Sequence, residues 1–240
     1  MNNIKVCFSV DLFHKYKDNK SIVVVVDILR ATSVISTAFE YGIKEIIPVK
    51  SLKETLEFNN RKDHILAAER NTVRIKGFNY GNSPFHYTKP EIKNKTLVLT
   101  TTNGTKAIEL AKNHHLITAS FINIDIVVEY LKTKKHDVII LCSGWKGFFN
   151  LEDTIFAGAL AKRLLKTNSF CHNCDSLYAS IHLYNNASDN IFSFLSSSSY
   201  RKRNDSNEII NDTLFCLKPS FKSRIIPILK KDRLVKENFC

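Results

Sequence analysis

The sequence has no long hydrophobic run, and its aliphatic stretches, such as Ile22 to Val26 and Val138 to Leu141, are short. A membrane-spanning helix needs about 20 apolar residues, so these stretches indicate buried strands. The first residues, from Met1 to Asp11, also lack the apolar segment of a secretory signal. We therefore expect a cytoplasmic protein with no membrane contact.

Cysteine is sparse as well, with six cysteines spread over 240 residues. This is not the density of a secreted domain stapled by disulfides, and we expect reduced thiols. Cys171 and Cys174 have the spacing of half a zinc site, but no second pair follows them. We interpret both as ordinary loop residues.

Positive charge is abundant: 35 Lys and Arg against 23 Asp and Glu give a formal net charge of +12. Such an excess is compatible with nucleic acid, an acidic membrane surface or an anionic substrate. Between Arg201 and Cys240 the basic residues are interspersed with apolar ones instead of forming an arm. This pattern favours a solvated basic face, and we expect no nucleic-acid partner.

Short β-branched runs alternate with segments of helical periodicity, which is typical of α/β proteins. We predict a three-layer α/β/α fold with a mostly parallel or mixed central sheet. It forms one domain over residues 1–240, with 200–240 as a possible appended subregion. The predicted strands are Lys5 to Val10, Ile22 to Asp27, Glu45 to Val49, His64 to Glu69, Thr96 to Thr101, Leu116 to Ser120, Asp137 to Cys142 and Leu177 to Leu183. The predicted helices are Ala31 to Tyr41, Leu52 to Asn60, Thr105 to His114, Ile124 to Thr133 and Glu152 to Lys166.

Three of the predicted strands end abruptly in groups that can do chemistry. These ends are Asp27 after four valines, Thr100 to Thr105, and Cys142 to Gly144. In open α/β sheets, ligands bind at the carboxyl ends of strands, where loops lead into helix N-termini. The pattern therefore predicts one anion site assembled from several strand ends.

Asp27 is the first candidate, because a buried carboxylate is costly unless it is paired, binds a metal or faces a cleft. Arg30 follows closely and can bind phosphate or sulfonate oxygens through two N–H groups. The alternative is that Asp27 caps the helix that begins near Ala31 and pairs with Arg30.

The threonine-rich turn from Thr100 to Thr105 also has two interpretations. Gly104 allows close backbone approach, and the threonines supply hydroxyls, which suits the turn to hold a phosphate. Plain helix capping by Asn103 or Thr105 is an equal alternative.

Acids stand at two further places. Glu69, next to Arg70, ends a predicted strand, and Glu152 and Asp153 open a predicted helix. Acids at a helix start also interact favourably with the helix dipole, so capping is the structural alternative for that pair.

Two familiar phosphatase mechanisms are disfavoured by residue spacing. The arginine position of the cysteine-phosphatase loop that would start at Cys142 is occupied by Phe148. The second aspartate of the haloacid-dehalogenase pattern that would start at Asp27 is replaced by Leu29. Neither a cysteinyl-phosphate nor an aspartyl-phosphate route has local support.

Together these segments resemble the 2-phosphosulfolactate phosphatase family, whose members carry DVLRATS-type, GER-type, GF-x-x-GNSP, TTNGT and ED-x-x-x-AG stretches. The corresponding segments here are Asp27 to Ser33, Ala68 to Arg70, Gly77 to Pro84, Thr101 to Thr105 and Glu152 to Gly158. Each motif is weak alone, but all of them in order make a specific signal. The similarity extends less sharply from residue 4 to about residue 227.

The resemblance implies a phosphoric monoester hydrolase that uses Mg²⁺ to convert 2-phosphosulfolactate into 3-sulfolactate and phosphate, a step associated with coenzyme M synthesis. A water, or less readily Asp27 itself, would attack phosphorus, and arginines would neutralise the phosphoryl charge. The expected catalytic residues are Asp27, Arg30, Glu69, Arg70, Glu152 and Asp153. The expected Mg²⁺ ligands are drawn from Asp27, Glu69, Glu152 and Asp153. The expected substrate-binding residues are Thr32, Ser33, Asn82, Ser83, Thr102, Asn103, Gly104, Thr105, Asn123, Ser143 and Gly144.

Two alternatives stay open. One is a phosphatase of the same fold that acts on another anionic phospho-hydroxy acid. The other is a non-catalytic basic homologue that binds anions or nucleic acid. We expect a small anionic phosphoester as the partner, and the sequence leaves assembly into a homo-oligomer open.

Overall fold

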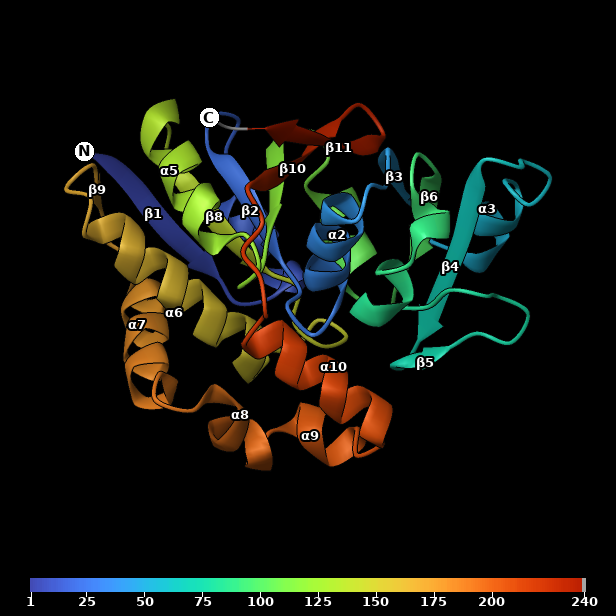
Figure 1. Cartoon of the computed structure of the whole chain (residues 1–240). Coiled ribbons are helices and arrows are strands. Elements are labelled where there is room, and N and C mark those ends of the chain that lie inside the picture. Colours follow the sequence, from blue (N-terminus) through green and yellow to red (C-terminus); the bar gives the residue numbers. More distant parts are fainter. Residues whose placement is uncertain (239–240) are drawn as a thin grey trace.

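The computed structural model of the chain describes residues 1–238 and contains a mixed sheet of 11 strands with helices on both faces (Figure 1). The predicted three-layer α/β fold is confirmed. The strands are β1 (Asn2–Cys7), β2 (Ile22–Val26), β3 (Glu45–Pro48), β4 (His64–Arg70), β5 (Val73–Arg74), β6 (Thr96–Thr100), β7 (His115–Ala119), β8 (Val138–Cys142), β9 (Phe170–Cys171), β10 (Ile225–Lys230) and β11 (Arg233–Asn238).

The helices vary widely in length. The α-helices are α1 (Phe13–Tyr16), α2 (Ala31–Glu40), α3 (Leu52–Leu56), α4 (Gly104–Leu110), α5 (Ile124–Lys134), α6 (Leu151–Leu165), α7 (Asp175–Ala187), α8 (Ile191–Phe194), α9 (Ser199–Arg203) and α10 (Asn207–Leu217). Short 3₁₀ turns are η1 (Val10–Leu12), η2 (Pro84–Tyr87), η3 (Pro90–Ile92) and η4 (Leu195–Ser197). No helix within residues 1–238 is both long enough and apolar enough to cross a membrane.

The sheet consists of two parallel groups joined by an antiparallel hairpin. Its order is β5-β4-β6-β3-β11-β10-β7-β2-β8-β1-β9. Strands β4, β6 and β3 are parallel to one another, as are β7, β2, β8, β1 and β9. The hairpin β10–β11 pairs with β7 on one side and with the first residues of β3 on the other. The C-terminal segment therefore closes the sheet between its two halves.

Strand β2 shows why the core has two sides. All five of its residues are buried, and neighbouring side chains alternate between the faces. Val24 and Val26 belong to the cluster that includes α5 and α6, whereas Val23 and Val25 belong to the cluster that includes α2 and α4. A strand covered on both faces reads as a continuous apolar run, which is how the sequence presents it.

Most predicted elements are present, and one predicted strand needs correction. The predicted strands correspond to β1 to β4 and β6 to β8, and the predicted helices correspond to α2 to α6. The predicted strand Leu177 to Leu183 is wrong, because this segment lies inside α7. Its buried residues Leu177, Ser180 and Ala187 follow a helical spacing, which the short apolar alternation concealed.

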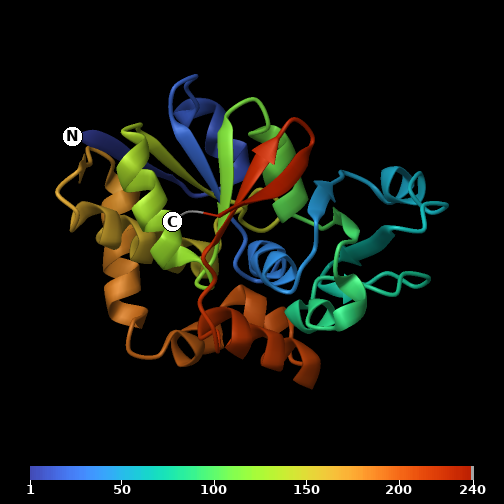
Figure 2. The same ribbon diagram turned by 45° about the horizontal axis from the view of Figure 1, so that its top comes forward.

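The C-terminal third contains elements that the prediction did not include. Helices α8, α9 and α10 lie along one edge of the sheet in both views (Figures 1 and 2). The hairpin β10–β11 was also missed, since Pro227 interrupts a strand-like run. The thiols of Cys7, Cys142, Cys171, Cys174 and Cys216 are free, and Cys240 lies outside the described residues.

Gly158, the last residue of the acidic motif, allows α6 and α7 to approach closely. An added Cβ would lie 2.0 Å from the carbonyl oxygen of Ser180 and 2.9 Å from the Cβ of Tyr184. Neither contact is tolerable, and the first is to backbone. The glycine of the motif therefore serves helix packing.

We predict that Gly158→Ala lowers the free energy of unfolding by about 1–3 kcal/mol, because α7 must move to accommodate the methyl group. Urea unfolding followed by circular dichroism measures the change. In an exposed helix the same substitution stabilises by about 1 kcal/mol, so a gain in stability would contradict this close contact.

Candidate active site

Four buried acids gather near the carboxyl ends of the parallel strands. Asp27 follows β2, Glu69 lies near the end of β4, and Glu152 and Asp153 occupy the first turn of α6. Their exposed fractions are 8%, 3%, 4% and 1%. Asp27 interacts electrostatically with the other three, so the acids form one cluster.

Gly104 brings the two halves of the sheet together at this cluster. Strands β2 and β6 are separated in the sheet, but the backbone after β6 touches Asp27. A Cβ at Gly104 would lie 2.7 Å from Oδ2 of Asp27 and 2.5 Å from the Cβ of Ala31. Any larger residue would push the carboxylate away, so the glycine of the TTNGT motif is required for this approach.

The four acids are buried close together, and within the described chain no cation in ion-pair contact compensates the repulsion among their negative charges. Burial and repulsion from Glu69 raise the pKa of Asp27 from 3.8 to about 7. Burial and repulsion from Asp27 raise the pKa of Asp153 well above its usual value, and burial raises the pKa of Glu152. Within residues 1–238, none of the four forms an ion pair with a lysine, arginine or histidine.

The hydrogen bonds divide the cluster into two kinds of carboxylate. Asp153 accepts from the backbone N–H of Ile28 at 2.9 Å, that of Gly144 at 3.3 Å and the Asn150 amide at 2.9 Å. Glu69 accepts from the backbone N–H groups of Thr72 and Thr102 and from the Thr102 hydroxyl. These two carboxylates hold the surrounding loops in place.

Asp27 and Glu152 are less committed to the protein. Asp27 accepts a long bond of 3.4 Å from the N–H of Ala31, and a backbone contact from Gly104 also lowers its pKa. Glu152 accepts one bond of 3.2 Å from Asn150. Their remaining carboxylate oxygens can therefore accept an external ligand. The alternative in which Asp27 pairs with Arg30 is not what the structure contains, because Arg30 pairs with another acid.

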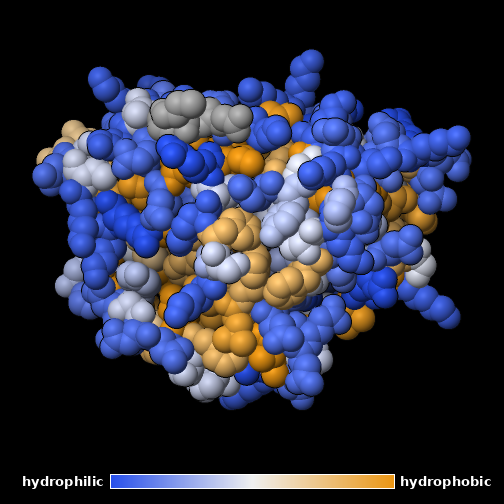
Figure 3. All heavy atoms as spheres, viewed as in Figure 1, coloured by the Kyte–Doolittle hydropathy of each residue, from blue (hydrophilic) through white to orange (hydrophobic). Residues whose placement is uncertain are grey.

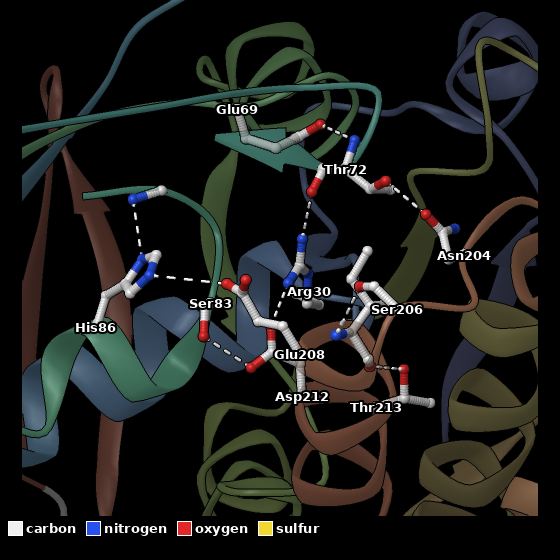
Figure 4. Close-up of polar contacts among 12 residues, drawn as sticks. Arg30, Glu69, Thr72, Ser83, His86, Asn204, Ser206, Glu208, Asp212 and Thr213 are labelled. Atoms are coloured by element: carbon white, nitrogen blue, oxygen red, sulfur yellow. Dashed lines mark hydrogen bonds and ion pairs between the residues drawn. The ribbon is translucent and has the colours of Figure 1, made fainter. Parts of the chain in front are cut away.

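Arg30 is held between two segments that are distant in sequence (Figure 4). One guanidinium nitrogen donates to Asp212 on α10, and the other donates to the carbonyl of Thr72 at 2.8 Å. The side chains of Arg30 and Asp212 are 4% and 0% exposed. Asp212 also accepts from the Ser83 hydroxyl at 2.7 Å. Arg30 is therefore a fixed, charged group that ties α10 to the strand ends.

Arg70 is fixed in a similar way on the other half of the sheet. Its guanidinium donates to the carbonyl of Glu69 at 2.6 Å and to the hydroxyl of Thr100 at 2.9 Å. The side chain is partly exposed, so its positive charge remains open to solvent beside the cluster.

Several predicted substrate-binding residues are used within the fold. Thr32 accepts from the Asp27 N–H, Ser33 donates to the Ile28 carbonyl, and Thr105 exchanges bonds with Thr101. The side-chain amide of Asn123 binds backbone groups of Ser120, Thr118 and Ile225. Gly144 has a left-handed backbone, and its N–H binds Asp153.

Other predicted residues lie nearer to open space. Thr102, Asn103 and Ser143 line a cavity of about 420 Å³. Asn82 is buried, and its side-chain oxygen has no hydrogen-bond partner within the described chain. Ser83 is engaged with Asp212.

The site also contains residues that the sequence did not reveal. Asp212 and Asn150 hold Arg30 and the acids of α6, but neither lies in a motif that marks it. Arg203 lies 4.2 Å from the ring of Trp145, and its charge opposes the raised pKa of Glu152. Both Arg203 and Asp212 come from the C-terminal helices, whose positions no local pattern indicates.

Cysteine chemistry has no support at this edge of the sheet. Cys142 is fully buried, and burial raises the pKa of its thiol well above the usual value. The thiol is therefore protonated and is a poor nucleophile.

A larger groove of about 650 Å³ lies between η2 and α10. Its walls include Phe85, Leu214 and Phe215, and Figure 3 shows an apolar area over α10 on this face. None of the four acids lines it. The groove is therefore separate from the acid cluster, although Ser83, His86 and Lys218 contribute polar groups to its wall.

We predict that Asp212→Asn lowers the free energy of unfolding by about 3–5 kcal/mol, because it leaves the buried Arg30 charge without a carboxylate. Ser83→Ala is the matched control and should cost about 1 kcal/mol, since it removes one hydrogen bond to the same acid. Urea unfolding compares the two. Equal losses would mean that the ion pair is not what stabilises this part of the site.

We also predict a pH-dependent effect of Asp27 in the metal-free protein. Its folded pKa of about 7 lies above its ordinary 3.8, so its contribution to stability is full below pH 3.8 and is lost as pH rises through 7. Asp27→Asn should therefore stabilise the protein at pH 8 relative to pH 4, by up to about 4 kcal/mol. Thermal and urea unfolding at both pH values measure it, with exposed Asp189→Asn as the control. A pH-independent difference would contradict the raised pKa.

Comparison with known proteins connects this geometry to a family. Residues 7–232 match the family described as 2-phosphosulpholactate phosphatase. A relative from Thermotoga maritima is 44% identical over 193 residues, which cover 80% of this chain and 82% of the relative. One from Clostridium botulinum is 34% identical over 237 residues, covering 97% and 99%. One from Caldanaerobacter subterraneus is 36% identical over 212 residues, covering 87% of each.

Each of these relatives bears the name probable 2-phosphosulfolactate phosphatase. The family match spans the four acids, both arginines and Asp212. The chain therefore belongs to the 2-phosphosulpholactate phosphatase family, a family of phosphoric monoester hydrolases.

Proposed function

We propose that the chain is a Mg²⁺-dependent phosphatase that hydrolyses 2-phosphosulfolactate to 3-sulfolactate and phosphate, as in coenzyme M type sulfonate pathways. The observation that carries the proposal is the cluster of buried acids beside the fixed guanidinium of Arg30. Family membership supports the substrate, because the relatives are named for it.

The donor set of the cluster fits Mg²⁺. Within residues 1–238, no three acid, histidine or cysteine side chains converge into a ready-made metal cage. Mg²⁺ does not need one, since it is usually held by one or two carboxylates together with waters and substrate phosphate oxygens. Asp27 and Glu152 are the best candidates because their oxygens accept few hydrogen bonds. Glu69 and Asp153, the other expected ligands, accept more hydrogen bonds from the protein and would hold the loops around the ion in place.

Bound Mg²⁺ would neutralise the acids and the phosphoryl oxygens. Arg30 and Arg70 would stabilise the negative charge that develops on the transferred group, and Arg30 would do so without moving because Asp212 and Thr72 hold it. The pKa of about 7 belongs to Asp27 in the metal-free protein, and bound Mg²⁺ would lower it, so Asp27 would act as an ionised ligand that helps to orient the attacking water.

The reaction balances without any further reactant. The water oxygen forms a bond to phosphorus, and the bond between phosphorus and the ester oxygen of the substrate breaks. The ester oxygen takes up a proton and leaves as the hydroxyl of 3-sulfolactate. The proton released by the attacking water would pass to solvent or to the leaving oxygen.

We predict that the purified protein releases phosphate from 2-phosphosulfolactate when Mg²⁺ is present and that a chelator removes the activity. Asp27→Asn should lower kcat by roughly 100-fold or more while the fold remains intact by circular dichroism. Asp189→Asn, at an exposed site, is the matched control. Phosphate release is measured over a panel of phospho-hydroxy acids.

Three outcomes would contradict the proposal. Turnover that survives the chelator would show that the reaction does not need Mg²⁺. Full activity of Asp27→Asn would show that this carboxylate has no part in the mechanism. Release of phosphate only from another member of the panel would keep the phosphatase and replace the substrate.

A further inference from the structure

A cavity of about 420 Å³ opens beside the acid cluster and is formed by three loops. Its volume lies within the range of about 300–1,000 Å³ that small-molecule sites occupy. Thr102 on its wall donates to Glu69 at 2.9 Å. Ser143, also on the wall, binds the carbonyl of Val26, the residue directly before Asp27. Two residues of the cavity wall are therefore hydrogen-bonded to the acid cluster and to the backbone beside Asp27.

Two lysines give this cavity its charge. Lys106 comes from α4, and Lys146 comes from the turn after β8. Asp11 is the single acid among the lining residues, so the wall carries a net positive charge. Both lysines are exposed to solvent, and neither forms an ion pair with a carboxylate within residues 1–238. The Lys146 ammonium lies 5.4 Å from the centre of the Trp145 ring, and because no carboxylate of the described chain pairs with either lysine, both charges are available to a ligand.

The backbone presents Lys146 in a defined position. It has a left-handed φ of 52° and lies in a turn closed by hydrogen bonds of 2.9 and 3.0 Å between Trp145 and Phe148. Its N–H donates to the side-chain oxygen of Asn103 at 3.0 Å. The turn is therefore attached to the loop after β6, which leads directly into α4 and Lys106.

Gly147 and Asp11 fix the other side of the turn. A Cβ at Gly147 would lie 2.2 Å from Oδ2 of Asp11, so the carboxylate rests directly against this backbone. Asp11 thus shapes the wall of the cavity next to Lys146. Its carboxylate reduces the positive charge of the wall, which stays positive because Lys106 and Lys146 outnumber it.

We propose that Lys106 and Lys146 bind the sulfonate end of the substrate and set the preference for a sulfonated phosphoester over its sulfonate-free analogue. This inference rests on the proposed function. The phosphate would lie at the acids and Arg30, and the three-carbon chain would extend into the cavity. A sulfonate offers three anionic oxygens, which two ammonium groups and the amide of Asn103 can bind together.

The experiment compares two substrates that differ only in the sulfonate: 2-phosphosulfolactate and 2-phospholactate. Their ratio of kcat/KM is measured for the wild type, Lys106→Gln and Lys146→Gln. Each variant should lower the ratio roughly 10- to 100-fold, the range expected when a hydrogen bond to a charged group is lost. Most of the change should lie in KM for the sulfonated substrate. Lys146→Arg should restore part of the preference.

Lys132→Gln is the matched control, because it removes the same charge from the exposed end of α5, where Lys132 pairs with Glu129. It should leave the ratio unchanged. If Lys106→Gln and Lys146→Gln also leave the ratio unchanged, the proposal is wrong. An equal loss with both substrates would assign these lysines to the phosphate or to general electrostatics and would also overturn it.

A binding measurement separates this proposal from the proposed function. Titration calorimetry compares 3-sulfolactate with lactate on the wild type and both variants. If the wild type hydrolyses neither substrate, the proposed function fails, while tighter binding of 3-sulfolactate that both variants lose would still support the sulfonate site. If 3-sulfolactate binds no more tightly than lactate, the sulfonate site is excluded.

Discussion

The main constraint on this structure is the free-energy cost of burying four carboxylates close to one another. Asp27, Glu69, Glu152 and Asp153 are each less than a tenth exposed, and burial together with the repulsion among them raises the pKa values of Asp27 and Asp153. An isolated buried charge is among the costliest groups that a fold can contain. The protein bears this cost at one edge of the sheet, where a bound cation would relieve it.

Hydrogen bonds from the surrounding backbone and side chains hold two of the four carboxylates in place despite their mutual repulsion. Asp153 is fixed by two backbone N–H groups and an amide, and Glu69 is fixed by Thr72 and Thr102. The positive charge nearest in sequence, Arg30, is directed away from Asp27 by its pairing with Asp212. The fold therefore keeps its cation and its acids apart inside one site. Within residues 1–238, Asp27 is left without an ion-pair partner, whereas Asp212 balances the charge of Arg30.

Much of the fold followed from local patterns. The valines of β2 and the short apolar runs of β6, β7 and β8 have no stable place except a buried sheet, and the polar residues that follow them lie at the carboxyl ends of the strands. Local patterns failed where tertiary packing decides. The segment around Leu177 alternates like a strand, but its contact with α6 selects a helix. Asp212 is a single acid in a polar helix, and only the path of the C-terminal chain brings it to Arg30.

The motifs behind the resemblance mix two kinds of residue, and the structure separates them by physical role. Gly104 and Gly158 have no chemistry of their own: one lets a loop reach Asp27, and the other lets two helices pack. Thr32, Ser33 and Thr105 secure the turns in which the charged groups stand. A motif of this kind preserves a geometry as much as a set of reactive groups. The lysines of the cavity show the converse, because residues that select a substrate need only face it. They can stand beside a motif or between motifs, and their role becomes visible only when the loops that carry them are assembled.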